Sequence, residues 1–379
     1  RSEAQLQQDE EEESSCRSCL GRVDVAWRSP SYAAGNMNII GGIEGETNRE
    51  GATLNECAGE LASLLTALGL SHVEVWVAEE DERAAEHLRQ LYEKAPPVGV
   101  TLIVTCTTSA VATFARLHSN KFRERTVRIV HFGGALVQAE MVEGLPTGNL
   151  QLRPDPGAQN NRLDMDSATE LYCEAQRLSV PMTILSRHVA KACCVPTALF
   201  DQLRQHGGKV GRSLYNMQAK LMQELFTRAC SSDIEVRRGL PQRCDKEWFA
   251  KTFCKGAVLS DADEVWSALE SINLYNPLAL LAALPGVEER YFAVNHLTFR
   301  SATHKLIGLS AERGCGVQPK RLGDLRSLIY HSIFYGSTAN ASDFGLCAGL
   351  DVHLARCAVP LRLEGEPKFE GVATVWSYQ

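Results

Sequence analysis

The sequence predicts an α/β fold in which a mainly parallel central sheet is flanked by helices and carries a helical cap. Two observations lead to this expectation. Between residues 22 and 185, short apolar runs alternate with segments of helical periodicity, as in strands joined by crossover helices. After Pro196, the pattern is largely helical up to Leu284, and we expect this stretch to form the cap.

The individual elements follow from the spacing of apolar residues. The predicted strands lie at residues 23–27, 37–43, 73–77, 101–106, 126–132 and 182–185. The predicted helices lie at residues 53–68, 83–94, 109–118 and 167–177. The strand at 101–106 is nearly all apolar, as expected for a strand with both faces buried in a parallel sheet. The region after Glu289 is mixed, with a β-like segment at residues 371–378.

The chain consists of two regions that differ in composition. Residues 1–21 are rich in Gln, Glu, Asp and Ser, and residues 9–13 are all acidic, so we expect a disordered tail or one that a partner orders. Residues 22–379 contain no repeat and no linker rich in Pro or Gly. We therefore expect one domain over residues 22–379.

The charge balance and the apolar runs exclude several classes of partner. The formal net charge is −7, which argues against nucleic acid and anionic membranes, because both attract clustered Lys and Arg. No apolar run approaches the roughly 18 residues needed to cross a bilayer. The sequence therefore predicts a protein that is soluble or attached to a membrane only peripherally, and we expect its partners to be other proteins or further copies of the chain.

The 13 cysteines are scattered and odd in number, a pattern that favours reduced thiols over a secreted disulfide framework. We expect a reducing intracellular compartment, either the cytoplasm or an organelle matrix or stroma, where a removed transit peptide would leave no trace. Cys16 and Cys19 form a lone CxxC without the second pair that zinc needs. Cys193 and Cys194 are expected to fill a packed segment.

Five segments in a fixed order resemble landmarks of one enzyme family. Residues 127–136 (VRIVHFGGAL) follow a strand and helix at 101–116, and residues 164–168 (DMDSA) come four residues after Asn160. Residues 180–185 (VPMTIL) and 275–284 (YNPLALLAAL) complete the series. In this order they resemble the inosine-uridine-preferring nucleoside hydrolases, which cleave the N-glycosidic bond of ribonucleosides, over about residues 22–292.

This resemblance implies a calcium ion that activates water, held by aspartates after the first strand and by the aspartate of a late HDP motif. Calcium prefers six to eight oxygen ligands, with several carboxylates among them. Between residues 22 and 34 the only carboxylate is Asp24, followed by Arg28, and Asn276 stands in place of the late aspartate. We therefore predict that the family calcium is absent, that no metal is bound here, and that Asp24 and Asn276 are vestigial ligand positions.

The catalytic positions implied by the family are altered as well. Tyr275 stands in place of the histidine that helps the base to leave, so we predict no catalytic residue and regard Tyr275 and Asn276 as vestigial. Asn160 and Asn161 are the candidate substrate-binding residues. Asn160 alternatively caps the helix near Ser167 or stabilises a turn, and Asn276 is expected to cap the helix that follows it.

Three functions remain open at this point. The favoured interpretation is a catalytically degenerate nucleoside hydrolase fold, kept as a structural or interaction subunit of a larger assembly. The alternative is a divergent N-ribohydrolase for purine or pyrimidine nucleosides, with metal carboxylates from other positions such as Glu44, Glu46 and Asp155. A third, weaker interpretation keeps the pocket as a ligand sensor without chemistry.

Overall fold

The structure is a computed structural model that describes a defined set of residues. These are 22–26, 41–42, 59, 62–64, 66, 74–78, 81–95, 97–142, 145–237, 240–257, 259, 265–309 and 315–338. Of residues 22–26, 41–42, 74–78, 141–142 and 145–148, the backbone alone is described. The acidic run at 9–13, the CxxC cysteines and the segment at 371–378 lie outside the described residues.

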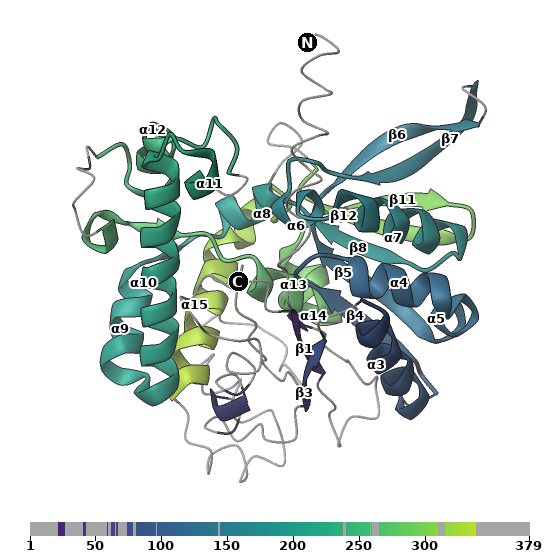
Figure 1. The fold of residues 1–379 in the computed structure, drawn as a ribbon, viewed down its shortest axis with the longest axis horizontal. Helices are drawn as coiled ribbons and strands as arrows, with labels where there is room; N and C mark the ends of the chain where they lie inside the picture. The colour runs from purple at the N-terminus through teal and green to yellow at the C-terminus, as the bar shows by residue number, and fades with distance from the viewer. Residues whose placement is uncertain are drawn as a thin grey trace.

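The central sheet has five strands in the order β11-β12-β8-β5-β4 (Figure 1). Strands β4 (Val100–Val104), β5 (Thr126–Phe132), β8 (Met182–Leu185) and β12 (Ala302–Ile307) are parallel to one another. Only β11 (Val294–Phe299), at the edge, is antiparallel. This confirms the predicted fold class, a mainly parallel sheet flanked by helices.

Helices cover both faces of this sheet. Helices α3 (Asp81–Lys94), α4 (Ser109–Leu117), α5 (Ser119–Arg125) and α7 (Met165–Arg177) lie on one face, and α13 (Asn276–Ala283) and α14 (Pro285–Tyr291) on the other (Figure 1). Successive side chains of β4 point to opposite faces. Leu102 therefore packs in the core under α3, α4 and α7, whereas Ile103 packs in the core that contains α13.

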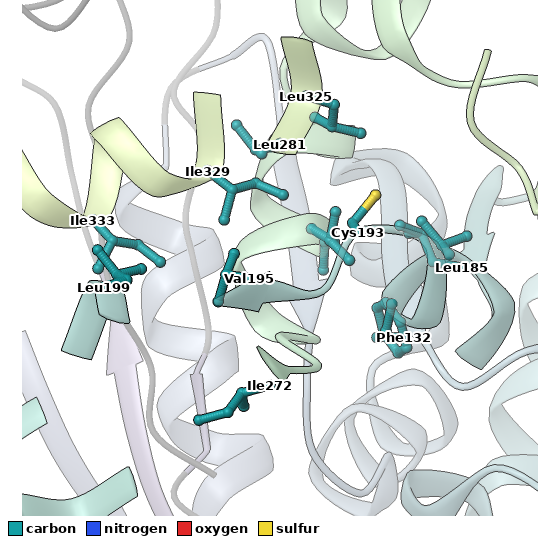
Figure 2. Packing of buried hydrophobic residues seen from close by; sticks show 14 of the residues in the cluster. Phe132, Leu185, Cys193, Val195, Leu199, Ile272, Leu281, Leu325, Ile329 and Ile333 are labelled. Carbon is teal, nitrogen blue, oxygen red and sulfur yellow. The ribbon is translucent and has the colours of Figure 1, made fainter. Parts of the chain in front are cut away.

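The cap consists of helices beside the sheet (Figure 1). It contains α8 (Arg187–Ala192), α9 (Ala198–His206), α10 (Gly208–Cys230), α11 (Ile234–Arg237), α12 (Lys246–Phe253) and α15 (Leu322–Thr338). One apolar cluster joins cap and sheet: Leu325, Ile329 and Ile333 of α15 lie in the same core as Phe132 and Leu185 (Figure 2). Cys193 is fully buried in this cluster, which confirms its predicted packing.

The first predicted strands are paired differently from the expectation of one parallel sheet. Strand β1 (Arg22–Ala26) pairs antiparallel with β2 (Gly41–Gly42) on one side and with β3 (Glu74–Ala78) on the other. These three strands form a separate sheet. Asp24 lies in β1 opposite Trp76 and Gly42, and its side chain is not among those described.

A long hairpin, not expected from the sequence, projects from the carboxyl end of the sheet (Figure 1). It consists of β6 (Ala135–Val142) and β7 (Leu145–Pro154). Leu136, Val137 and Leu150 are exposed on it. Because side chains on both faces meet solvent, the hairpin lacks the alternating pattern by which half-buried strands are recognised.

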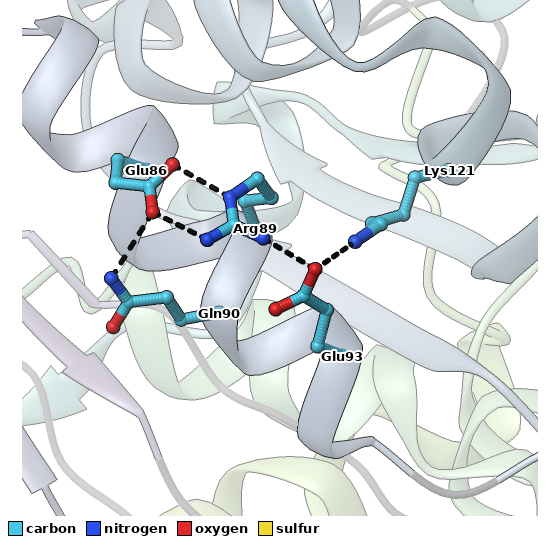
Figure 3. A network of polar contacts seen from close by, with 5 residues as sticks. All are labelled: Glu86, Arg89, Gln90, Glu93 and Lys121. Carbon is cyan, nitrogen blue, oxygen red and sulfur yellow. Dashed lines mark hydrogen bonds and ion pairs between the residues drawn. The ribbon is translucent and has the colours of Figure 1, made fainter.

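Helix α3 confirms the polar-faced helix predicted at residues 83–94. Arg89 donates to Glu86 at 2.6 and 2.7 Å and also pairs with Glu93, which accepts from Lys121 of α5 at 2.7 Å (Figure 3). The hydrogen bond from Arg89 is the main reason why the pKa of Glu86 is lowered to about 2. This network joins the outer faces of α3 and α5.

In the described part of the chain, no helix is long and apolar enough to cross a membrane.

Candidate functional site

The candidate site lies where the parallel strands end. In α/β proteins, ligands bind at the carboxyl ends of the strands, because loops and helix N-termini converge there. Strand β4 leads into residues 105–109, β5 into Gly133 and Gly134, and β8 into Ser186 and Arg187. The segment between β7 and α6 (Gln159–Arg162) reaches the same edge, because Asp155 donates its backbone N–H to the Gly134 carbonyl at 3.4 Å.

A row of hydroxyl side chains follows β4. Thr105, Thr107, Thr108 and Ser109 are all buried, and the hydroxyls of Thr107 and Ser109 lie 3.4 Å apart. The sequence TCTTS at residues 105–109 shows that hydroxyl residues directly follow an apolar strand. The family motifs did not include this segment, so it was not singled out as a candidate site. The row supplies neutral oxygens at the start of α4 and no negative charge.

Asn160 joins the ends of two parallel strands. Its Nδ2 donates to the Phe132 carbonyl at 2.8 Å and to the Thr105 carbonyl at 3.2 Å. The expected cap is therefore wrong: α7 is capped by Asp164, whose carboxylate accepts from the Ser167 N–H at 3.0 Å. Because both strands end beside Asn160, its position at the predicted functional edge is fixed by the sheet, and its Oδ1 is the atom that can accept from a ligand.

Asn161 is fully buried and serves the protein itself. Its Nδ2 donates to the carbonyls of Gly133 at 2.6 Å and Asp155 at 3.0 Å. Its Oδ1 lies 3.0 Å from Nε2 of the equally buried His131. We therefore assign Asn161 to the support of the Gly133–Gly134 turn, in place of the substrate contact expected from the sequence.

His131 and Gly133 leave no spare room in this turn. A Cβ on Gly133 would lie 2.0 Å from His131 Nε2 and 2.5 Å from Asn161 Oδ1. Gly134 has a φ of +65°, a conformation that favours glycine. Its carbonyl accepts from the hydroxyl of Tyr172 at 2.7 Å. The GG pair is therefore explained by packing and backbone conformation, independently of any ligand.

Arg187 brings a positive charge to the same edge. Its Nη1 donates to the Gly157 carbonyl at 2.8 Å, and the Gly157 N–H donates to Asp155 Oδ1 at 2.8 Å. Burial lowers the pKa of the neighbouring His188, the charge of Arg187 lowers it further, and Asp155 opposes this. His188 is thus neutral near pH 7 and adds no anionic ligand.

Tyr275 and Asn276 lie at the start of α13. The Tyr275 ring packs edge-on against Phe132, with centroids 5.0 Å apart. Burial raises the pKa of its phenol, and the charge of Arg187 lowers it in part. Asn276 is 8% exposed and is the first residue of α13, whose N-cap position is Tyr275 and has no side-chain cap. The expected capping of α13 by Asn276 is therefore wrong, because the helix begins one residue earlier than Pro277 suggested.

The described residues at this edge do not fit a calcium ion. Calcium affinity depends on the number of carboxylate ligands, and the described loops after β4, β5 and β8 contain hydroxyls, glycines and Arg187. Asp155 is a carboxylate already engaged with Gly157, and Asn276 is neutral. Among the residues with a described structure, no three His, Cys, Asp or Glu side chains gather as metal ligands. Glu44 and Glu46 lie outside the described residues.

Comparison with known proteins adds structural relatives. No protein-family model and no curated protein matches the chain. The structure is similar to the type III effector protein XopQ complexed with adenosine diphosphate ribose, with a TM-score of 0.50 and 25% identity over 64% of this chain and 61% of that one. For the effector protein XOO4466 the TM-score is 0.50 and the identity 24%, over 66% and 64%.

A purine-preferring ribonucleoside hydrolase from Gardnerella vaginalis also matches, with a TM-score of 0.38 and 16% identity over 73% of this chain and 75% of that one. The structural neighbours are proteins with the nucleoside hydrolase fold. The chain spans less than two thirds of the length of the two effector proteins.

Proposed function

We propose that this chain is a nucleoside hydrolase-fold protein without calcium-dependent hydrolysis, kept as a structural or interaction subunit of a larger assembly. The observation that carries the proposal is the neutral Asn276 at the start of α13, where the resemblance places a calcium aspartate. The proposal is also supported by Arg187, whose positive charge lowers the pKa of the adjacent Tyr275 phenol and so partly offsets the effect of burial. A divalent cation at this edge would meet a guanidinium where it needs carboxylates.

The interaction part of the proposal is supported by the β6–β7 hairpin. An isolated two-stranded ribbon is marginally stable in water, and this one exposes Leu136, Val137 and Leu150. Exposed apolar side chains grouped on a projecting element are typical of a surface that contacts another protein. The acidic residues 9–13 supply a second candidate attachment element.

A second candidate function is ligand binding without chemistry. It is favoured by the similarity to XopQ, which was solved with adenosine diphosphate ribose. The edge offers polar groups for such a ligand, including Asn160 and the hydroxyls of residues 105–109. We propose a ribonucleoside-containing ligand of this chemical class as the occupant.

The alternative of a divergent N-ribohydrolase requires a metal or another means to activate water. Asp155 was one proposed source of a carboxylate, and its Oδ1 accepts from Gly157 N.

Incubation of the full chain with inosine, uridine and a chromogenic riboside, with and without Ca²⁺, separates the possibilities. The proposal predicts no turnover in any arm. Sustained turnover that disappears in Asn160→Ala would establish the hydrolase instead.

A further inference from the structure

The N-terminus of α4 is buried while its first backbone N–H groups lack acceptors. The first N–H groups of any helix have no partner within the helix and need one from elsewhere. In α4 they belong to Ser109, Ala110 and Val111, which are all buried. Within the described part of the chain, nothing accepts a hydrogen bond from these three N–H groups. This helix end therefore presents unused donors away from bulk water.

The hydroxyl of Thr108 is a further unsatisfied group at the same helix end. Thr108 is the N-cap residue of α4, is 0% exposed, and has no hydrogen-bond partner for its Oγ1 among the described residues. A threonine at this position usually caps its helix with that oxygen, but the Thr108 side chain makes no such bond. A buried hydroxyl without a partner destabilises a protein, so this atom points to a ligand that completes it.

The charge and the position of this helix end favour an anion. The helix dipole places partial positive charge at the N-terminus, and the residues on either side of Thr108 add only neutral hydroxyls, with Thr107 Oγ1 and Ser109 Oγ 3.4 Å apart. The candidate site is adjacent, because the half-buried Asn160 donates to the carbonyl of Thr105, three residues before Thr108, at 3.2 Å. An anion here would thus lie beside the ends of β4 and β5.

We propose that the N-terminus of α4, together with the Thr108 hydroxyl, is an oxyanion site that takes the phosphate group of a phosphorylated nucleoside. Backbone N–H groups at a helix N-terminus bind phosphate oxygens without any cationic side chain, and burial strengthens the attraction because the local dielectric is low. The inference rests on the proposed ligand-binding function and deepens it, since the attached nucleoside would lie toward Asn160. The phosphate contact itself does not require a nucleoside.

Titration calorimetry of the full chain at low salt tests this site with inorganic phosphate, AMP and adenosine. We expect AMP to bind at least about tenfold more tightly than adenosine. Thr108→Val keeps the shape of the side chain and removes the hydroxyl, so it should weaken phosphate and AMP binding about tenfold and leave adenosine binding unchanged. Thr113→Val, at a buried position further along α4, is the matched control and should change none of the three affinities.

Thermal denaturation without ligand separates a binding role of the hydroxyl from a structural one. Because the Thr108 hydroxyl has no partner in the described structure, Thr108→Val should leave the midpoint unchanged or raise it. A midpoint below that of Thr113→Val would overturn the inference, since the hydroxyl would then stabilise the fold.

The binding outcomes distinguish this inference from the function on which it rests. Adenosine binding without phosphate binding would overturn the oxyanion site and leave the proposed ligand-binding function standing. Phosphate binding without adenosine binding would support the oxyanion site and remove the nucleoside from the proposed function. Phosphate binding that Thr108→Val leaves intact, or that Thr113→Val weakens equally, would also overturn the site.

Discussion

His131 Nε2 lies 3.0 Å from Asn161 Oδ1, and His131 Nδ1 lies 3.1 Å from the Val104 carbonyl. The fully buried imidazole thus joins β4, β5 and α6. Burial lowers the pKa of His131, while its two hydrogen-bonded oxygens oppose this shift. The neutral ring has one N–H for two oxygen partners, so the turn depends on Asn161 to hold both the ring and the Gly133 carbonyl.

Removal of the Asn161 side chain should therefore destabilise the protein. Asn161→Ala removes the side-chain donor from the Gly133 carbonyl and the oxygen partner from His131 Nε2, whereas the Asp155 carbonyl keeps the Ala158 N–H and His131 Nδ1 keeps the Val104 carbonyl. A buried group left unsatisfied costs about 1–3 kcal/mol. We expect a loss of at least about 2 kcal/mol in the free energy of unfolding, measured by urea denaturation. Asn216→Ala, at an exposed helical position, is the control. Equal stability of the two variants would contradict the supporting role.

His304 should make stability depend on pH. This residue of β12 is fully buried, and burial lowers its pKa from 6.5 to about 4. The unfolded chain then binds more protons between pH 4 and 6.5, so the stabilisation is complete above pH 6.5 and is lost as the pH falls toward 4. The loss from this group should approach about 3 kcal/mol.

The contribution of His304 is isolated by comparing variants across this pH range. The decrease in unfolding free energy from pH 7 to pH 4.5 should be smaller in His304→Met than in the unchanged chain. His296→Gln, on the exposed part of β11, should keep the original profile. If His304→Met also keeps that profile, the histidine does not titrate as burial requires.

Glu288 connects the sheet to α14 through two cations. It is 2% exposed, accepts from Arg128 Nη1 at 2.9 Å and from Lys305 Nζ at 2.5 Å. Glu288→Ala leaves the largely buried Arg128 without its carboxylate, and loss of one partner from a buried pair costs about 3–5 kcal/mol.

The denaturation midpoint of Glu288→Ala should therefore fall clearly below that of the unchanged chain. Glu247→Ala removes the exposed partner of Lys251 and should leave the midpoint unchanged, because solvent screens that pair. Similar midpoints for the two variants would show that the buried pair contributes no net stability.

Asn276→Asp restores the residue that the resemblance places at the calcium site. Position 276 is 8% exposed, so a carboxylate there loses hydration, and we expect stability to be unchanged or lower by about 1 kcal/mol. The exposed Asn216→Asp controls for the charge change. No riboside cleavage should appear. Calcium-dependent cleavage in the single variant would mean that the remaining ligands are present elsewhere in the chain.

The fold could be predicted where strands are apolar and helices amphipathic. The central strands predicted at 126–132 and 182–185 coincide with β5 and β8. Strand β12 was not predicted, because His304 and Lys305 interrupt its apolar pattern. The packing of α15 into the cap was also missed, since it depends on contacts between segments far apart in the sequence.

The predicted site residues lie at the carboxyl ends of the parallel strands, and their roles stay predictions. Asn160 and Asn161 were singled out through their motif, but only the geometry shows that Asn160 joins two strand ends whereas Asn161 is fully buried. The hydrogen bonds from Arg237 to the carbonyls of Ser231, Pro241 and Cys244 could not be predicted, because backbone carbonyls carry no residue-specific signal.

The central claim, that the calcium site is lost, is tested most directly by titrating Ca²⁺ into the full chain in a calorimeter. The account predicts no binding heat above dilution at millimolar Ca²⁺, and the same result for Asn216→Asp. Tight, saturable Ca²⁺ binding that disappears in Asp24→Ala would contradict it, because the first strand would then contribute to a working metal site.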